Sequence, residues 1–338
     1  MERINELNEP LLDLKEDRLA IFPIKYNNLW EMYKLQRSAF WLPDEVDLSK
    51  DVIDWLKLTE DERYFIEHIL AFFSQSDGLV NMNLGLRFNR EVQIPEAKFV
   101  YRYQAMMEDI HNEMYSLMIN NLIKDEGKKE RLFKAIETIP CIKAKGDWCM
   151  KWITSDAKFS KRLIAFAIVE GIYFSGAFCS IYWLKQRNLM NGLCIANEFI
   201  ARDEGLHCTF ACMLYEMMNN KIDEEEVQEM FKEAINIEKE FILESLPCKL
   251  IGMNADLMKQ YIEFVGDRLL VQLGYNKIYY TKNPFVFMDA ISLSSKTNFF
   301  EHRTTQYQKA NLTVLNKQTV IGNKNSIDNN IIELSDDF

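Results

Sequence analysis

Two pairs of side chains in this sequence have the types and the spacing of metal ligands. Glu108 and His111 are three residues apart in EDIHNEMY, and Glu204 and His207 have the same spacing in DEGLH. Three residues correspond to about 300° of an α-helix, so the carboxylate and the imidazole of each pair would project from one helix face. The two pairs use two of the four histidines in the chain. Their repetition predicts a site for two metal ions.

A single acid in apolar surroundings precedes each pair. Asp77 lies in LAFFSQSDGLV, 31 residues before Glu108, and Glu170 lies in IAFAIVEGIYF, 34 residues before Glu204. One acid on one helix and Glu-x-x-His on the next, repeated twice, is the arrangement of ferritin-like di-metal carboxylate proteins. Four carboxylates carry a total charge of about −4, which two divalent ions would neutralise in an apolar core.

The chemistry of these six side chains indicates which metals they would bind. Carboxylate oxygens combined with imidazole nitrogens suit iron or manganese, and the absence of cysteine from the set argues against structural zinc. The alternative is that the four acids are solvated on helix surfaces and that the two histidines are incidental. The apolar sequence around Asp77 and Glu170 argues against this alternative, because an unpaired buried charge is costly.

Residues 163–184, LIAFAIVEGIYFSGAFCSIYWL, are apolar or small except for Glu170, and basic residues flank them on both sides. A transmembrane helix has this length and these flanks. A helix buried on all sides in a soluble bundle has the same composition. A ligand role for Glu170 explains the carboxylate at the centre of the run, so we expect a buried helix and no membrane span.

The elements that must position these side chains are long helices. The chain of 338 residues is 48% hydrophobic and contains only 12 Gly and 7 Pro, too few for the turns of an all-β fold. A capping box at Thr59 to Glu62 and Pro95 at a helix entry mark two helix starts, and Pro140 breaks the pattern. After an irregular start we expect helices over about 60–88, 95–123, a shorter one to 138, 160–187, 193–218, 224–246 and 256–274. The predicted fold is an all-α, ferritin-like helical bundle with long helices around a di-metal carboxylate site.

Charge and composition exclude some classes of function and divide the chain. The net charge is −11 without a basic cluster, which argues against nucleic-acid binding. Seven cysteines without a C-x-x-C pair, behind a polar N-terminus that is not a targeting peptide, indicate reduced thiols and a cytoplasmic location. We expect an irregular segment over 1–20, the bundle over 21–310 and a flexible tail over 311–338. The last residues, IIELSDDF, are either a frayed terminus or a docking peptide.

Tyr115 lies four residues after His111 and therefore on the face of the predicted metal ligands. A buried core tyrosine is the commoner explanation of such a residue. A phenol in a dry apolar pocket beside an oxidising metal pair could instead hold a long-lived radical. By helical phase its neighbours would include Phe174 and Phe178.

At this point the sequence resembles a known family, the small, radical-generating subunit of class I ribonucleotide reductase in its eukaryotic-type form. The resemblance runs from about residue 20 to the C-terminus. Its motifs are FWLPDEVDLSKD (40–51), LAFFSQSDGLVN (70–81), EDIHNEMYSLMI (108–119), VEGIYFSGAF (169–178), ARDEGLHCTFAC (201–212), LIGMNADLMKQYIEFVGDRLL (250–270) and KTNFFEHR (296–303). One departure is Met82, where the family usually has glutamate.

The resemblance implies a role for each matching residue. Two iron ions per chain would be bound by Asp77, Glu108 and His111 and by Glu170, Glu204 and His207, although the same ligands accept manganese. Tyr115 would hold the radical inside an apolar shell of Phe174, Phe178 and Ile200. The radical would leave by way of His111, Trp41, Asp203 and Tyr307. The docking residues for the large subunit would be Ile331, Ile332, Leu334, Asp336, Asp337 and Phe338.

The implied function is that of the small subunit of ribonucleoside-diphosphate reductase, an oxidoreductase that makes deoxyribonucleotides for DNA replication. Its di-iron site would activate O2 to form a tyrosyl radical, which the large subunit uses to reduce ribonucleoside diphosphates. The chain would be a homodimer and would need no nucleotide site of its own, and it contains no P-loop or G-x-G-x-x-G motif. Two other functions of the same fold stay open: a di-iron oxidase or hydroxylase, and an iron-storage protein.

Overall fold

The computed structural model describes residues 9–245, 254–285 and 287–288. Over these ranges the chain forms helices, turns and connecting segments and contains no β-strand, so the predicted all-α class is confirmed. Five helices have 18 or more residues: α3 (Glu60–Asn83), α5 (Pro95–Leu122), α11 (Asn191–Glu216), α12 (Glu224–Ser245) and α13 (Ala255–Gln272).

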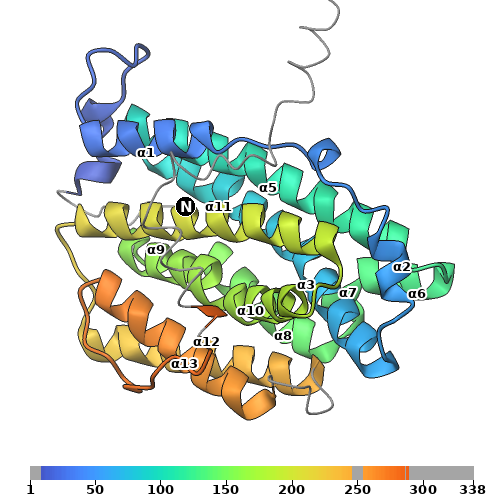
Figure 1. The fold of residues 1–338 in the computed structure, drawn as a ribbon. Helices are drawn as coiled ribbons and strands as arrows, with labels where there is room; N and C mark the ends of the chain where they lie inside the picture. Colours follow the sequence, from blue (N-terminus) through green and yellow to red (C-terminus); the bar gives the residue numbers. More distant parts are fainter. Residues whose placement is uncertain (1–8, 246–253, 286, 289–338) are drawn as a thin grey trace, which may run out of the picture. The chain divides into compact units, whose positions relative to one another are not determined.

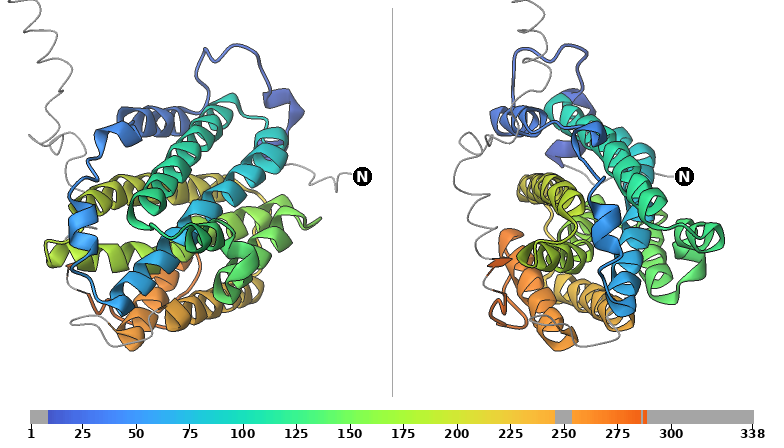
Figure 2. Two further views of the ribbon diagram at one scale, coloured as in Figure 1. Left: turned by 90° about the vertical axis from the view of Figure 1, so that its right-hand side faces the viewer. Right: turned by 45° about the vertical axis from the view of Figure 1, so that its right-hand side comes forward.

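The apolar run at the centre of the sequence is also central in the packing. It forms α9 (Phe159–Ile168) and α10 (Ser175–Gln186), joined by a five-residue π-helix, η5 (Val169–Tyr173). Helix α11 packs on α9 and α10, α12 and α13 pack on each other and on η5, and α3 packs along α5. Figures 1 and 2 show α5 on one side of α9 and α10, and α12 and α13 on the other.

Burial decides between the two expectations for this run. One helix in the described part of the chain, Phe159–Gln186, is long and apolar enough to cross a membrane, and 89% of its most apolar stretch is buried inside the protein. Its apolar surface is therefore covered by other helices, as expected for a bundle core. The helix predicted over 160–187 is present as Phe159–Gln186, with η5 as a π-helical turn inside it.

Shorter helices complete the described chain. They are η1 (Pro10–Leu12), η2 (Leu14–Glu16), α1 (Asn27–Ser38), η3 (Pro43–Glu45), α2 (Asp51–Trp55), the π-helix η4 (Leu84–Phe88), α4 (Asn89–Glu91), α6 (Glu126–Phe133), α7 (Ala135–Thr138) and α8 (Pro140–Ile153).

Local signals in the sequence account for several helix starts. The capping box at the start of α3 is present, with Glu62 N donating to Thr59 Oγ1 at 3.2 Å and Thr59 N donating to Glu62 Oε2 at 2.8 Å. Pro95 is the first residue of α5. Pro140 is likewise the first residue of α8, so it begins a helix instead of ending a pattern. Proline is accepted there because the first helical N–H has no intrahelical partner.

Helix α1 corrects the expectation of an irregular start before residue 59. Its sequence, NNLWEMYKLQRS, has apolar residues at helical spacing, Leu29, Met32 and Tyr33, a signal that the sequence analysis did not use. Tertiary contacts stabilise it: Leu29 and Met32 are buried, and Tyr33 packs edge to face on Phe99 of α5 with ring centroids 5.4 Å apart. The predicted boundaries at residues 20 and 310 stay predictions, since residues 1–8 and 289–338 lie outside the described part.

Candidate metal centre

Four helical segments converge on one buried cluster of carboxylates and imidazoles. Its members are Asp77 from α3, Glu108 and His111 from α5, Glu170 from η5, and Glu204 and His207 from α11. Each of these residues is at most 3% exposed. The ligand atoms form two groups, each with all atoms within 4.8 Å of one another: Glu108, Glu170, Glu204 and His207 in one, and Asp77, Glu108 and His111 in the other.

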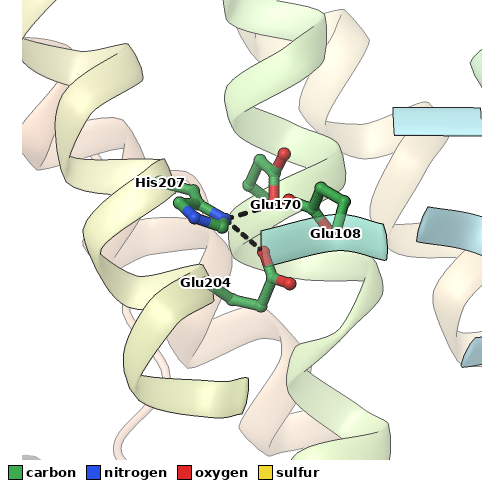
Figure 3. Close-up of side chains that lie close together, drawn as sticks. All are labelled: Glu108, Glu170, Glu204 and His207. Atoms are coloured by element: carbon green, nitrogen blue, oxygen red, sulfur yellow. Dashed lines mark hydrogen bonds and ion pairs between the residues drawn. The ribbon is translucent and has the colours of Figure 1, made fainter. Parts of the chain in front are cut away.

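The two Glu-x-x-His pairs face each other across the cluster. His207 Nδ1 lies 3.0 Å from Glu108 Oε1 and 3.0 Å from Glu204 Oε2 (Figure 3). His111 Nδ1 lies 3.0 Å from Glu204 Oε1 and 3.5 Å from Glu108 Oε2. Each glutamate therefore contacts both imidazoles. The resemblance assigned Glu108 to one ion and Glu204 to the other, whereas in the structure both glutamates lie within reach of both histidines.

Gln104 is a member of the site that sequence reasoning missed. Its Nε2 donates to Glu170 Oε1 at 3.0 Å and reaches Glu108 Oε1 at 3.5 Å, and the residue is fully buried. It thus orients two of the acids from different helices. Its position four residues before Glu108, on the same helix face, was a signal in the sequence.

Several carboxylate oxygens in the cluster have no donor. Asp77 Oδ2, Glu108 Oε2 and Glu170 Oε2 are buried and make no hydrogen bond with any described residue. A buried oxygen without a partner is destabilising, and native structures contain few of them. Divalent cations would satisfy these oxygens, so the residues fit an oxygen-rich site for two such ions.

Burial and the neighbouring charges together raise the pKa values of two acids and one histidine in the cluster. Burial, with the charge of Glu108, raises the pKa of Asp77 well above the ordinary carboxyl range, and burial, with the charge of Glu204, does the same for Glu170. Burial alone would lower the pKa of His207, but the charge of Glu204 and a hydrogen bond with Glu108 raise it to about 10. Protons thus offset the buried negative charge, and divalent ions would take over this role by displacing them.

Glu170 reaches the cluster from an irregular helical turn. It is the second residue of η5, whose π-helical hydrogen bonding lies between two α-helices. Single π-helical turns inside α-helices are frequent at functional sites, because the extra residue rotates the side chains that follow.

A hydrogen-bonded chain leads from the cluster towards the segment before η3. Trp41 Nε1 donates to Asp203 Oδ2 at 2.8 Å, and the same oxygen lies 3.3 Å from His111 Nε2. The guanidinium of Arg202 donates to Asp203 Oδ1 at 3.1 and 3.0 Å and to the Ala39 carbonyl at 2.7 Å. Arg202, which the sequence analysis did not single out, therefore links Asp203 to the segment that carries Trp41.

Tyr115 lies in a buried aromatic pocket beside the cluster. It is fully buried, and its hydroxyl has no hydrogen-bond partner among the described residues. Burial, with the charge of Asp77, raises its pKa well above the ordinary value. The ring of Phe73 stacks on Tyr115 with centroids 4.4 Å apart.

Phe73 connects Tyr115 to the two predicted shell residues. Its ring centroid is 5.8 Å from that of Phe174 and 5.2 Å from that of Phe178. Ile200 is fully buried in α11. Sequence reasoning missed Phe73, although it lies one helical turn before Asp77.

Not all residues singled out in the sequence belong to this site. Met82 lies on α3, 41% exposed, away from the buried cluster. Tyr307 and the predicted docking residues lie outside the described residues.

Comparison with known proteins identifies the family. The sequence model of the family described as "Ribonucleotide reductase, small chain" matches residues 18–284 of the 338. The chain belongs to this family. The match includes all six acids and histidines of the cluster, together with Tyr115, Trp41 and Asp203.

Individual relatives agree. The chain is 58% identical over 307 residues to the ribonucleoside-diphosphate reductase small chain of Neurospora crassa, covering 90% of this chain and 75% of the relative. It is 53% identical over 318 residues to the ribonucleoside-diphosphate reductase small subunit of Dictyostelium discoideum, covering 93% of this chain and 94% of the relative. Among solved structures, the ribonucleotide reductase Rnr4 homodimer from Saccharomyces cerevisiae has a TM-score of 0.77 at 37% identity, covering 85% of this chain and 92% of that one.

These findings confirm the predicted family, its eukaryotic type and the ferritin-like fold. They also confirm the predicted function as a small subunit of ribonucleoside-diphosphate reductase. Family membership separates this function from the oxidase and iron-storage alternatives. A fold match at 22% identity, the reductase R2 subunit from Clostridium botulinum with a TM-score of 0.74, supports the fold alone.

Proposed function

We propose that this small subunit binds two iron ions in the cluster and generates a stable radical at Tyr115 for use by the large subunit. The observation that carries the proposal is the buried six-residue cluster with its unpaired carboxylate oxygens, directly beside a tyrosine whose hydroxyl has no partner among the described residues. Iron, when bound there, supplies the reduction of O2 and the oxidising equivalent. Manganese suits the same ligands.

The grouping of the ligand atoms supports a role for each residue. Asp77, Glu108 and His111 would hold one ion, and Glu170, Glu204 and His207 would hold the other. Gln104 would hold Glu170 in orientation through its amide. Because the cluster is closed to solvent on all sides by helices, these residues also exclude water from the oxidising centre.

Tyr115 would lose an electron and its phenolic proton to become a neutral radical. The ring of Phe73, which stacks on Tyr115 and is itself packed against Phe174 and Phe178, would keep reductants and water away from it. A radical in such a pocket has few partners with which to react, so it would be long-lived.

The chain from His111 through Asp203 to Trp41 would carry the oxidising equivalent towards the large subunit. Asp203 can accept the indole proton of Trp41, because its Oδ2 already accepts that hydrogen bond. Its two bonds from Arg202 keep the carboxylate in this orientation. Tyr307 would continue the route, and the residues of IIELSDDF would dock on the large subunit. Nucleotide reduction would then take place in the large subunit.

The assembly is part of the proposal. A homodimer is supported by the similarity to a homodimeric reductase structure. A cytoplasmic location is supported by the six described cysteines, which are all free thiols, five of them buried.

The test is electron paramagnetic resonance after anaerobic loading with ferrous iron and exposure to air. The wild type should give a tyrosyl signal. The Tyr115→Phe variant, which loses only a hydroxyl, should bind the same amount of iron and give no tyrosyl signal and no reductase activity. Undiminished reductase activity in Tyr115→Phe would refute the proposal.

A further inference from the structure

A buried ion pair supports the irregular turn that carries Glu170. Lys145 of α8 and Glu238 of α12 are both 0% exposed, and Lys145 Nζ lies 2.6 Å from Glu238 Oε2. The same Nζ donates to the backbone carbonyl of Tyr173 at 2.7 Å. Tyr173 is the last residue of η5, so the pair is fastened to the C-terminal end of the π-helix.

The carboxylate of this pair packs on the other side of the same junction. A Cβ atom added to Gly176, in the first turn of α10, would lie 2.7 Å from Glu238 Oε1. Only a residue without a side chain permits this approach. Lys145 and Glu238 therefore contact the backbone just before and just after Phe174, where the helix changes from π to α.

The ammonium group of Lys145 also packs on two aromatic rings, one of which leads towards Tyr115. Lys145 Nζ lies 3.5 Å from the ring centroid of Phe72 and 4.1 Å from that of Phe241. The ring centroid of Phe72 is 5.6 Å from that of Phe174. Phe174 in turn packs on Phe73, the ring that stacks on Tyr115. A displacement of the pair would thus shift the turn that carries Glu170 and the ring of Phe72, which packs on Phe174.

Stability alone does not explain two charges at this depth. A buried ion pair can be replaced by apolar residues of similar volume at little cost, because desolvation offsets the attraction between the charges. What apolar residues cannot supply is a donor for the Tyr173 carbonyl. That carbonyl lies three residues after Glu170, on the same turn of helix.

We propose that Lys145 and Glu238 are positioning residues, which hold η5 so that Glu170 faces the second metal ion. The inference rests on the proposed function, since it takes Glu170 to be a ligand. It concerns a pair that lies outside the metal cluster and touches none of its six members. Loss of the pair should lower the affinity for the ion held by Glu170 and His207. The affinity for the ion held by Asp77 and His111 should stay nearly unchanged.

The experiment is a titration of the metal-free protein with Mn(II), in which free Mn(II) is counted by electron paramagnetic resonance. The variants are Lys145→Met/Glu238→Met and, as a control, Lys239→Met. Lys239 is also on α12 and pairs with Glu263 at 2.7 Å, away from η5. The wild type and the control should bind two ions per chain. The double variant should bind the second ion at least about tenfold more weakly, the range found when partners of ligands are removed.

Amide hydrogen exchange over residues 169–178 provides a second readout that does not depend on metal. Exchange there should be faster in the double variant than in Lys239→Met. If the double variant binds both ions like the wild type and exchange is unchanged, the inference is wrong while the proposed function stands. If the wild type itself binds no ions, the proposed function fails.

If the double variant does not fold, a more conservative substitution, Glu238→Asp, replaces it. Glu238→Asp keeps the charge and withdraws the carboxylate by one methylene group. It should therefore lower the affinity for the second ion and leave that for the first ion unchanged. An equal loss of affinity for both ions, or no loss of affinity, would overturn the inference.

Discussion

At the scale of single residues, Tyr115 combines a buried hydroxyl that is unpaired among the described residues, a feature that Tyr101 and Tyr173 share, with a position beside the metal cluster. Buried hydroxyls normally find a hydrogen-bond partner, because an unmet one costs about 1–3 kcal/mol. The Tyr115 hydroxyl has none among the described residues, and Phe73 stacks directly on its ring. A pocket that keeps a phenol buried and isolated is suited to protecting a radical.

Replacing Phe73 tests this protection. In Phe73→Leu the loss of the stacked ring should admit water or small reductants, so the half-life of the tyrosyl signal should fall by about tenfold while iron binding is retained. Phe88→Leu is a matched control, because Phe88 is equally buried and stacks on Tyr101 with centroids 5.6 Å apart. Equal radical half-lives in the two variants would argue against a protective role for Phe73. The measurement is the decay of the paramagnetic signal in air.

At the scale of helices, close packing around η5 determines where Glu170 lies. Gly171, the next residue, is in contact with α11 and α13. A Cβ atom added there would lie 2.9 Å from Cys208 Sγ and 3.0 Å from Leu269 Cδ2. These distances are shorter than normal carbon contacts, so the side chains of Cys208 and Leu269 would have to shift.

Two glycine substitutions separate packing from helix propensity. Gly171→Ala should destabilise the protein by about 1–3 kcal/mol through overpacking and should weaken metal binding by displacing Glu170. Gly205 is the residue after Glu204, and a Cβ atom added there would meet no atom within 4 Å. Gly205→Ala is therefore the control. It should stabilise α11 by about 0.5–1 kcal/mol, because alanine favours helix more than glycine does. Urea unfolding and a metal titration of both variants check the prediction, and destabilisation of equal size would contradict it.

At the scale of the whole molecule, the buried pair between α8 and α12 makes stability depend on pH. Burial raises the pKa of Glu238 to about 7 from an ordinary value of 4.5, while the charge of Lys145 opposes the shift. The folded chain therefore keeps a proton that the unfolded chain loses above about pH 4.5. The resulting stabilisation is fully present below that pH and is lost as the pH rises through about 7.

A comparison with Glu238→Gln isolates this contribution, since glutamine does not titrate. Between about pH 4.5 and 7.5 the free energy of unfolding of the metal-free wild type should fall relative to the variant, by on the order of 3 kcal/mol at most. Urea unfolding of both proteins at several pH values measures the difference. A constant difference across this range would show that the pKa of Glu238 is not raised.

The association with the large subunit is also a property of the whole molecule. Deletion of residues 331–338 should abolish reductase activity at ordinary concentrations without changing the tyrosyl signal. Excess large subunit should restore part of the activity if the deleted segment contributes only binding energy. Size-exclusion chromatography should give a dimer for both proteins, and full activity of the truncated protein would show that the segment is not needed for docking.

Much of the fold and the site could be predicted from the sequence, because the signals involved are local. The capping box at Thr59 and the proline at residue 95 fall within single turns of helix. The spacing of three residues between Glu108 and His111 determines their common face by helix geometry alone. The single acid in the run 163–184 indicated a buried ligand without knowledge of the neighbouring helices.

Other features depend on residues far apart in the chain, and only the tertiary structure decided them. Helix α1 is amphipathic in sequence, but contacts with α5 decide where it packs. The π-helical turn at Glu170 depends on packing against α11, α12 and α13 and has no local signal. Lys145 and Glu238 are separated by 93 positions, and their pairing follows from the way α8 and α12 pack. Local residue types and spacings thus determined which side chains could bind metal, whereas long-range packing decided how they face one another.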